Sequence, residues 1–208
     1  MSTEGITFAQ SNYYIEEQRT FYGGAVVGAN FSQIDGDNFA GYRKIGLNAG
    51  GIIYTNIAPK VAASMEILYS QRGARAHKNQ VSNTKQYLIT DYTIDLHYAE
   101  VPLQIHYYDK RKSHFGGGFS YSQLIGSDEK ATTSNTAFND TANLNNFSFR
   151  KFDVNFIVGG NLHLVKGLYL NVRFQYSLLP VRTAIHPEFG RAEQYSNMWV
   201  MRLMYLFD

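Results

Sequence analysis

Histidines are the residues of this 208-residue sequence best suited to act as general bases or metal ligands. They are His77, His97, His106, His114, His163 and His186. A zinc site on a helix needs two histidines four residues apart, and a common type of serine hydrolase needs a Gly-x-Ser-x-Gly turn. Neither pattern occurs in the sequence. We therefore expect His106 and His163 to be hydrogen-bonded structural residues, and a lipid-modifying enzyme stays an alternative.

Two further patterns are typical of ligand sites but lack their context. Asp35, Asp37 and Asn38 could offer oxygen atoms to Ca²⁺, but the rest of a calcium-binding loop is missing. Glycine clusters occur at Gly23-Gly24, Gly50-Gly51 and Gly116-Gly117-Gly118. No helix follows them, so strand curvature explains them better than phosphate binding. The sequence predicts no catalytic, metal or cofactor-binding residue and no cofactor.

Five charged residues occupy mid-strand positions in segments that alternate between apolar and polar side chains. They are Glu66, Glu100, Asp153, Arg173 and Arg202. An isolated charge inside a protein is costly, whereas a paired and hydrogen-bonded charge is tolerated. We therefore predict that the two glutamates pair with the two arginines, in an interior charge network that also holds Asp153.

Alternation with a period of two indicates that β-strands position these charges. The pattern is clearest in Phe152–Leu164 and in Leu168–Leu178, which a three-residue turn separates, and it returns in Val61–Arg72 and Trp199–Phe207. Less regular strands are expected at about Phe21–Phe31, Lys44–Ile57, Tyr92–Tyr108 and His114–Leu124. The sequence therefore predicts an all-β fold of eight antiparallel strands.

The connections between these strands alternate in length. Short links surround Ala58-Pro59, Asp109–Ser113 and Val165–Gly167, and long polar links cover Asp35–Tyr42, Gly73–Gln86, Gly126–Phe149 and Val181–Gln194. This layout is typical of outer-membrane barrels, which have short periplasmic turns and long extracellular loops. We expect an up-and-down transmembrane β-barrel over residues 21–208 and a flexible periplasmic leader over residues 1–20.

The apolar stripe is too bulky to fill an eight-stranded barrel, so we expect it to face lipid. The expected lipid-facing residues are Met65, Ile67, Phe156, Leu170, Val172, Phe174, Met201 and Leu203. Aromatic residues form 15% of the chain, and those near strand ends suit interfacial girdles. We place Tyr54, Tyr69, Tyr107, Tyr121, Tyr169, Tyr195 and Trp199 there.

One segment breaks the alternation. Apolar residues occupy even positions in Tyr92–Leu96 and odd positions in Val101–Tyr107. Pro102 lies at the change and cannot donate a hydrogen bond to a sheet. We therefore predict a β-bulge near Ala99–Pro102.

Two segments resemble a known family. Glu66–Ala74 (EILYSQRGA) and Tyr98–Leu103 (YAEVPL) are similar to the signatures of PorT-like outer-membrane barrels of Bacteroidetes-type bacteria, and the similarity extends from about Phe21 to Phe207. The resemblance implies a location in the outer membrane of a Gram-negative bacterium and, through the family's namesake, a link to protein secretion.

Four functions are therefore compared. The first is a non-enzymatic accessory or scaffold subunit of an envelope complex for protein secretion or insertion, with outer-membrane lipid and other outer-membrane proteins as partners. The second is a stand-alone barrel whose extracellular loops bind a ligand or surface, the third is the lipid-modifying enzyme, and the fourth is a soluble lipocalin-like binding barrel. A net charge of +2 without a long basic segment argues against nucleic acid as a partner. The sequence names neither the partners nor the oligomeric state.

Overall fold

The computed structural model describes residues 20–37, 41–76, 80–81, 88–109, 112–133, 148–184 and 190–207. Within these ranges the strands are β1 (Phe21–Asp37), β2 (Lys44–Ala58), β3 (Val61–Arg75), β4 (Gln80–Val81), β5 (Leu88–Tyr108), β6 (His114–Thr133), β7 (Phe152–Val165), β8 (Leu168–Ser177) and β9 (Gly190–Leu206). No helix in these ranges is long and apolar enough to cross a membrane.

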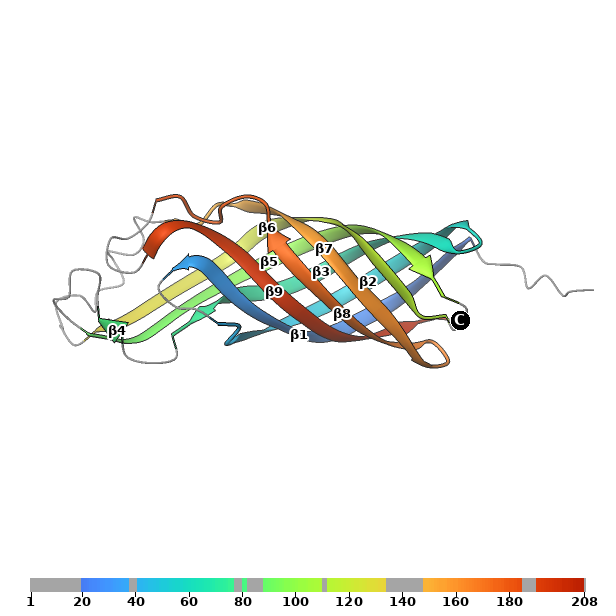
Figure 1. The fold of residues 1–208 in the computed structure, drawn as a ribbon, viewed down its shortest axis with the longest axis horizontal. Helices are drawn as coiled ribbons and strands as arrows, with labels where there is room; N and C mark the ends of the chain where they lie inside the picture. Colours follow the sequence, from blue (N-terminus) through green and yellow to red (C-terminus); the bar gives the residue numbers. More distant parts are fainter. Residues whose placement is uncertain are drawn as a thin grey trace, which may run out of the picture.

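Eight strands close into one antiparallel ring (Figure 1). Each strand pairs with the next one around the ring. The two-residue strand β4 is not part of the ring: it pairs with the end of β5, and β3 pairs directly with β5. The ring closes where β1 pairs with β9, from Gly24↔Leu206 to Asp35↔Tyr195. Closure satisfies the strand edges that an open sheet would expose. The predicted all-β, eight-stranded antiparallel barrel is confirmed.

The connections are sorted by length between the two ends of the barrel. The turns Pro59–Lys60, Asp109–Ser113 and Lys166–Gly167 lie at one end, which we call the turn rim, together with the C-terminus (Figure 1). The strand ends that the longer connections join, together with β4, lie at the opposite end, the loop rim. In outer-membrane barrels the short turns face the periplasm and the long loops face the exterior. The predicted leader, apart from residue 20, lies outside the described residues.

Inward-facing glycines keep the barrel narrow. A Cβ atom on Gly50 would lie 2.0 Å from the backbone oxygen of Ile67, and one on Gly118 would lie 2.0 Å from that of Leu103. Neither distance is sterically possible, so these positions require glycine. The strands therefore approach closely, and interior side chains reach across the barrel.

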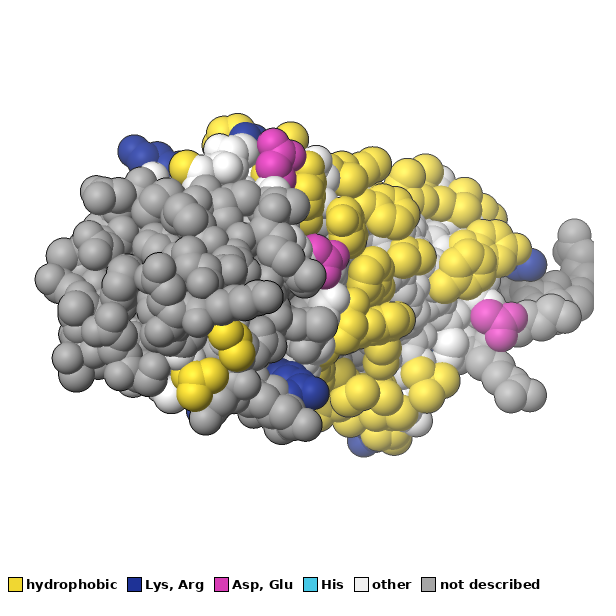
Figure 2. Space-filling view, turned by 60° about the vertical axis from the view of Figure 1, so that its left-hand side comes forward, with side chains coloured by type: hydrophobic (Ala, Val, Ile, Leu, Met, Phe, Trp, Pro, Cys, Tyr) yellow, Lys and Arg dark blue, Asp and Glu magenta, His cyan; other side chains and the backbone are white. Residues whose placement is uncertain are grey.

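Outward-facing apolar side chains form a band around the barrel, which we call the apolar belt (Figure 2). Its border at the turn rim consists of Phe21, Ile57, Tyr107, Phe115, Leu164 and Phe207. Its border toward the loop rim consists of Phe31, Tyr69, Tyr121, Phe152, Tyr176 and Trp199. The girdle prediction is wrong for Tyr54 and Tyr169, whose side chains are buried inside the barrel. Aromatic borders of this kind are typical of the two membrane–water interfaces.

Strand β5 exchanges the polarity of its inward-facing and outward-facing side chains at the border of the belt toward the loop rim. In residues 88–98 it places apolar side chains such as Ile94 inside and polar ones such as Asp95 outside. In residues 100–108 it places polar side chains inside, and Leu103 points outward with 57% of its surface exposed. The wall thus faces water near the loop rim and is apolar below it. The barrel therefore extends beyond the belt on the loop side.

The position predicted for the bulge, near Ala99–Pro102, is wrong, because the nearest shift in register comes just before it. Pro102 faces Ser120 within a register that is unbroken from Tyr98 to Tyr108. The pairing of β5 with β3 also keeps one register on both sides of Pro102. The register of the pair formed by β5 and β6 shifts between Ile89 and Asp91 and again between His97 and Tyr98, the latter at the border of the belt. Apolar residues change position because the strand passes from a water-exposed wall to the belt, while even-numbered residues of β5 face inward on both sides of the border.

Candidate functional site

The interior of the barrel has three layers. An apolar loop-rim cluster consists of Ile34, Ala74, Ile89, Tyr92, Ile94, Leu96 and Tyr98. An apolar turn-rim cluster consists of Val26, Ile52, Tyr54, Ala62, Leu68, Tyr169, Met204 and Leu206. Between them lies a polar layer in which Glu66, Arg72, Glu100 and Arg173 are each at most 1% exposed. We call this layer the interior charge network and regard it as the candidate site.

Glu66 on β3 is the centre of one half of the network. Its Oε1 atom accepts a hydrogen bond of 2.7 Å from Nη2 of Arg202 on β9, and its Oε2 atom forms an ion pair of 2.7 Å with Arg202 Nη1. Arg173 on β8 donates to both carboxylate oxygens at 3.2 Å, and Gln104 Nε2 donates to Oε1 at 2.9 Å. Arg202 also donates from Nε to Asn171 Oδ1 at 2.7 Å. Paired, charge-assisted bonds of this kind are strong and fix the geometry.

Arg72 is the centre of the other half. Its Nη2 atom donates to Glu100 Oε2 at 2.6 Å, and its Nη1 atom lies 3.2 Å from Asp153 Oδ2. The guanidinium group lies over the Tyr98 ring, 4.7 Å from its centroid, so it also contacts the loop-rim cluster. Gln175 Nε2 donates to Glu100 Oε1 at 2.6 Å. The carboxylates of Glu66 and Glu100 thus each have several polar partners.

Arg173 joins the two halves, since its Nη2 atom lies 3.8 Å from Glu100 Oε1. The structure brings together Glu66, Glu100, Asp153, Arg173 and Arg202, the five residues named from the sequence. Arg72 belongs to the network as well, although the sequence analysis omitted it. It could have been found because it lies on the same face of β3 as Glu66. With Arg72 included, three arginines balance three carboxylates.

A further buried ion pair lies near the loop rim. Arg182, in the connection between β8 and β9, is 2% exposed and forms a two-pronged ion pair with Glu129 of β6. Tyr92 also donates to Glu129 Oε1 at 2.5 Å, and the Arg182 guanidinium lies 3.8 Å from the centroid of the Phe149 ring. Arg182 and Glu129 lie in segments predicted as loops, so sequence reasoning missed them.

Two interior histidines lie near hydroxyl groups in the lower part of the barrel. His106 Nε2 is 2.7 Å from Ser64 Oγ, and His114 Nε2 is 3.1 Å from Tyr54 Oη. His106 Nδ1 has no hydrogen-bond partner in the described part of the chain, so no carboxylate orients this Ser–His pair as a catalytic triad would require. Nor do the described residues include a group of three His, Asp or Glu side chains that could hold a metal ion. The contacts of His106 and His114 are therefore part of the packing of the barrel interior.

The residues expected to face lipid all point away from the interior. Met65, Ile67, Phe156, Met201 and Leu203 are exposed. Leu170, Val172 and Phe174 are half-buried by neighbours on the outer wall and alternate with the buried residues of β8. The arrangement has charges inside and apolar residues outside, the reverse of a water-soluble protein. It defines a small integral barrel of the outer membrane.

The sequence comparison gives the same class. The model of the family described as "outer membrane protein beta-barrel domain" matches residues 8–182. The chain therefore belongs to this family, and its location is the outer membrane of a Gram-negative bacterium. None of the curated proteins searched matches the sequence.

Several solved structures are similar. Ail, the attachment invasion locus protein of Yersinia pestis, is 11% identical with a TM-score of 0.49, and the match covers 89% of this chain and 98% of that chain. Neisserial surface protein A is 10% identical with a TM-score of 0.40, covering 90% and 97%. The outer membrane protein AlkL is 18% identical with a TM-score of 0.40, covering 100% and 97%.

Proposed function

We propose that this protein is a non-enzymatic surface barrel whose extracellular connections bind a ligand or surface outside the cell. The observation that carries the proposal is the extension of the wall beyond the apolar belt. There, β5 and β6 present polar side chains to water and enclose the loop-rim cluster. An extension with its own apolar core is a rigid support for binding loops.

The ion pair of Arg182 and Glu129 supports this proposal. It ties the β8–β9 connection to β6, and backbone bonds join Val181 to Gln194 at 2.7 Å and to Arg150 at 2.8 Å. The bases of two long connections are thereby fixed to one another. A fixed base lowers the entropy that a loop loses when it binds a ligand.

The loop composition suggests the first probe. Residues 134–147 contain five asparagines, and amide side chains both donate and accept hydrogen bonds, as sugar hydroxyl groups require. The test is binding of the protein in lipid nanodiscs to an array of neutral oligosaccharides. A variant with residues 134–147 replaced by a Gly-Ser linker of equal length is compared with the parent.

We expect the parent to bind and the loop variant to lose binding while keeping its thermal stability. The control is a replacement of Asp109–Ser113 at the turn rim by a linker of equal length, which should leave binding unchanged. Equal binding by parent and loop variant would contradict a role for this connection. Absence of binding, together with a stoichiometric outer-membrane partner in a mild-detergent pull-down, would replace the proposal with the subunit function.

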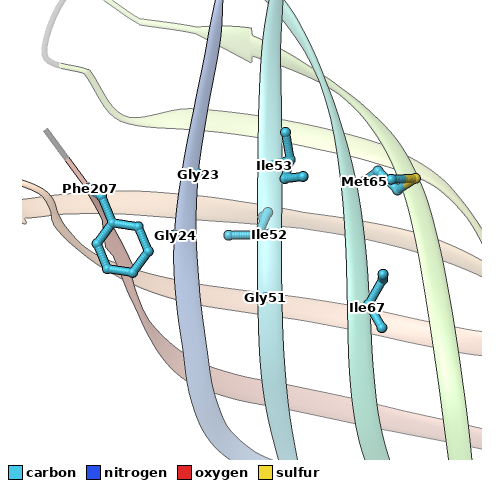
Figure 3. Close-up of a pocket in the computed structure, with 8 residues that line it drawn as sticks. All are labelled: Gly23, Gly24, Gly51, Ile52, Ile53, Met65, Ile67 and Phe207. Carbon is cyan, nitrogen blue, oxygen red and sulfur yellow. The ribbon is translucent and has the colours of Figure 1, made fainter.

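The second candidate is the accessory subunit of a secretion or insertion complex. An outward hollow of about 300 Å³ favours it, with a floor at Gly23 and Gly51 and walls that include Met65, Ile67 and Phe207 (Figure 3). A hollow of this kind could receive a side chain of another membrane protein, because small residues allow close packing in lipid. The PorT-like segments do not add to this argument, since they supply Glu66, Arg72 and Glu100 to the interior.

A further inference from the structure

Three more hollows follow one another on the outer wall over β3, β5, β6 and β7. The first, of about 300 Å³, lies at the turn rim against Asp109, Ser113 and Phe115. The second, of about 370 Å³, shares Phe115, and the third, of about 510 Å³, shares Ile105 with the second. Together they form a track from the turn rim into the apolar belt, which we call the β5–β7 track.

The glycine that opens the lowest hollow is not required by the packing of the barrel. A Cβ atom on outward-facing Gly160 would lie 3.8 Å from its nearest neighbour, the backbone oxygen of His114, which is an ordinary contact. On the adjacent inward-facing Gly159 it would lie 2.5 Å from the Arg173 side chain. The fold therefore demands glycine at 159 only. Glycine at 160 leaves an apolar recess between Phe115 and Leu162.

Lysines lie on the turns below the track. Lys112 and Lys166 are exposed, and their turns are joined, because the His163 N–H donates to Ser113 Oγ at 3.2 Å and His163 Nε2 lies 2.6 Å from the Lys166 backbone oxygen. At the turn between β2 and β3, the backbone oxygen of Lys60 accepts a hydrogen bond of 2.9 Å from the Tyr108 N–H. Asp109 is the acidic residue among these described turns, so cations prevail.

We propose that the β5–β7 track binds an anionic phospholipid of the periplasmic leaflet. The acyl chains lie along the hollows of the belt, and the phosphate group lies at the turn rim near Lys112 and Lys166. The apolar lining fits acyl chains, and the positive charge at its base fits a negatively charged headgroup. A second copy of this chain is a poorer occupant, because the same lysines would repel each other across a symmetric contact.

The test measures lipid preference at the track directly. The single tryptophan, Trp199, is changed to Phe, and Phe115→Trp places a reporter between the first two hollows. The protein is reconstituted with brominated phosphatidylglycerol or brominated phosphatidylcholine, whose bromine atoms quench nearby tryptophan. We expect the anionic lipid to bind about fivefold more tightly, the preference expected from roughly one basic residue at the surface.

The double variant Lys112→Asn/Lys166→Asn should reduce this preference to about one. Both lysines have positive φ, 64° and 49°, which asparagine tolerates, so the turns keep their shape. Lys130→Asn on the loop side is the matched control and should leave the preference unchanged. A reporter at the hollow of Figure 3, Met65→Trp, should show a weaker preference than the track.

Equal quenching by the two lipids at Phe115→Trp would overturn the proposal. So would a preference that survives the double variant. Quenching by neither lipid, with cross-linked dimers in the same vesicles, would assign the track to a second copy of the chain. The heat-dependent gel shift of each variant verifies that it is folded.

Discussion

At the scale of single residues, the interior charges are stabilised because each has more than one partner. Glu66 contacts both Arg202 and Arg173, and Arg72 contacts both Glu100 and Asp153. Removing one member therefore leaves at least one buried charge uncompensated. A buried charge without a partner costs several kcal/mol, so the network should respond strongly to single changes.

We expect Glu66→Gln to lower the free energy of unfolding by about 3–5 kcal/mol, because Arg173 and Arg202 lose their shared anion. Glu193→Gln, which removes an exposed carboxylate, should change it by less than about 0.5 kcal/mol. Urea titration of folding into lipid vesicles measures both. Equal stability of the two variants would mean that water solvates the network.

Adjacent glycines in β2 offer a second prediction. Gly50→Ala should destabilise the barrel by at least about 1–3 kcal/mol, because its Cβ atom would meet the Ile67 backbone oxygen. Gly51→Ala should be tolerated, since its Cβ atom would lie 3.9 Å from the nearest atom. The yield of heat-modifiable, folded protein distinguishes them. A stable Gly50→Ala variant would show that the strands can move apart.

At the scale of elements, β5 shows that one strand can satisfy two environments while its even-numbered residues from Tyr92 onward keep facing inward. Its outward side chains meet water above the belt and hydrocarbon within it. The cost of a charge on the outer wall should therefore depend on position along the strand. Strand length follows from this, because β5 and β6 have 21 and 20 residues, more than a belt alone needs.

Leu103→Arg should reduce the stability in lipid by about 2–4 kcal/mol, because it places a charge in the middle of the belt. Thr93→Arg on the same strand lies above the belt and should cost less than about 1 kcal/mol. Denaturant titrations in vesicles compare the two variants. Similar costs would mean that the belt is wrongly placed along β5.

At the scale of the whole molecule, three layers of buried side chains occupy the described part of the barrel interior. We expect the protein in planar lipid bilayers to show no conductance steps of the size that open porins give. Arg182→Ala should not change this result, because the interior charge network still fills the middle of the barrel. Stable porin-like steps from the parent protein would contradict the assignment of a filled interior.

The sequence supported prediction of the strands and of most interior charges, because both follow from alternation. The strand prediction failed where the outer wall of the barrel faces water, because outward-facing side chains are polar there. The polar outer face of residues 125–133 resembles a loop, so β6 was predicted to end at Leu124 and not at Thr133. Arg182 and Glu129 were missed for the same reason. Contacts between distant strands, such as that of Arg72 with Asp153, depend on how the ring closes.

The distribution of the interior charges has a consequence for the order in which the barrel assembles. Strands β3 and β5 bring one arginine, Arg72, and two glutamates, whereas β7, β8 and β9 bring one aspartate and two arginines. The two groups of strands thus bring opposite net charges to the network. Neither group is neutralised until the two groups face one another, so a half-inserted sheet would expose charge to hydrocarbon. Insertion and ring closure should therefore be one concerted event.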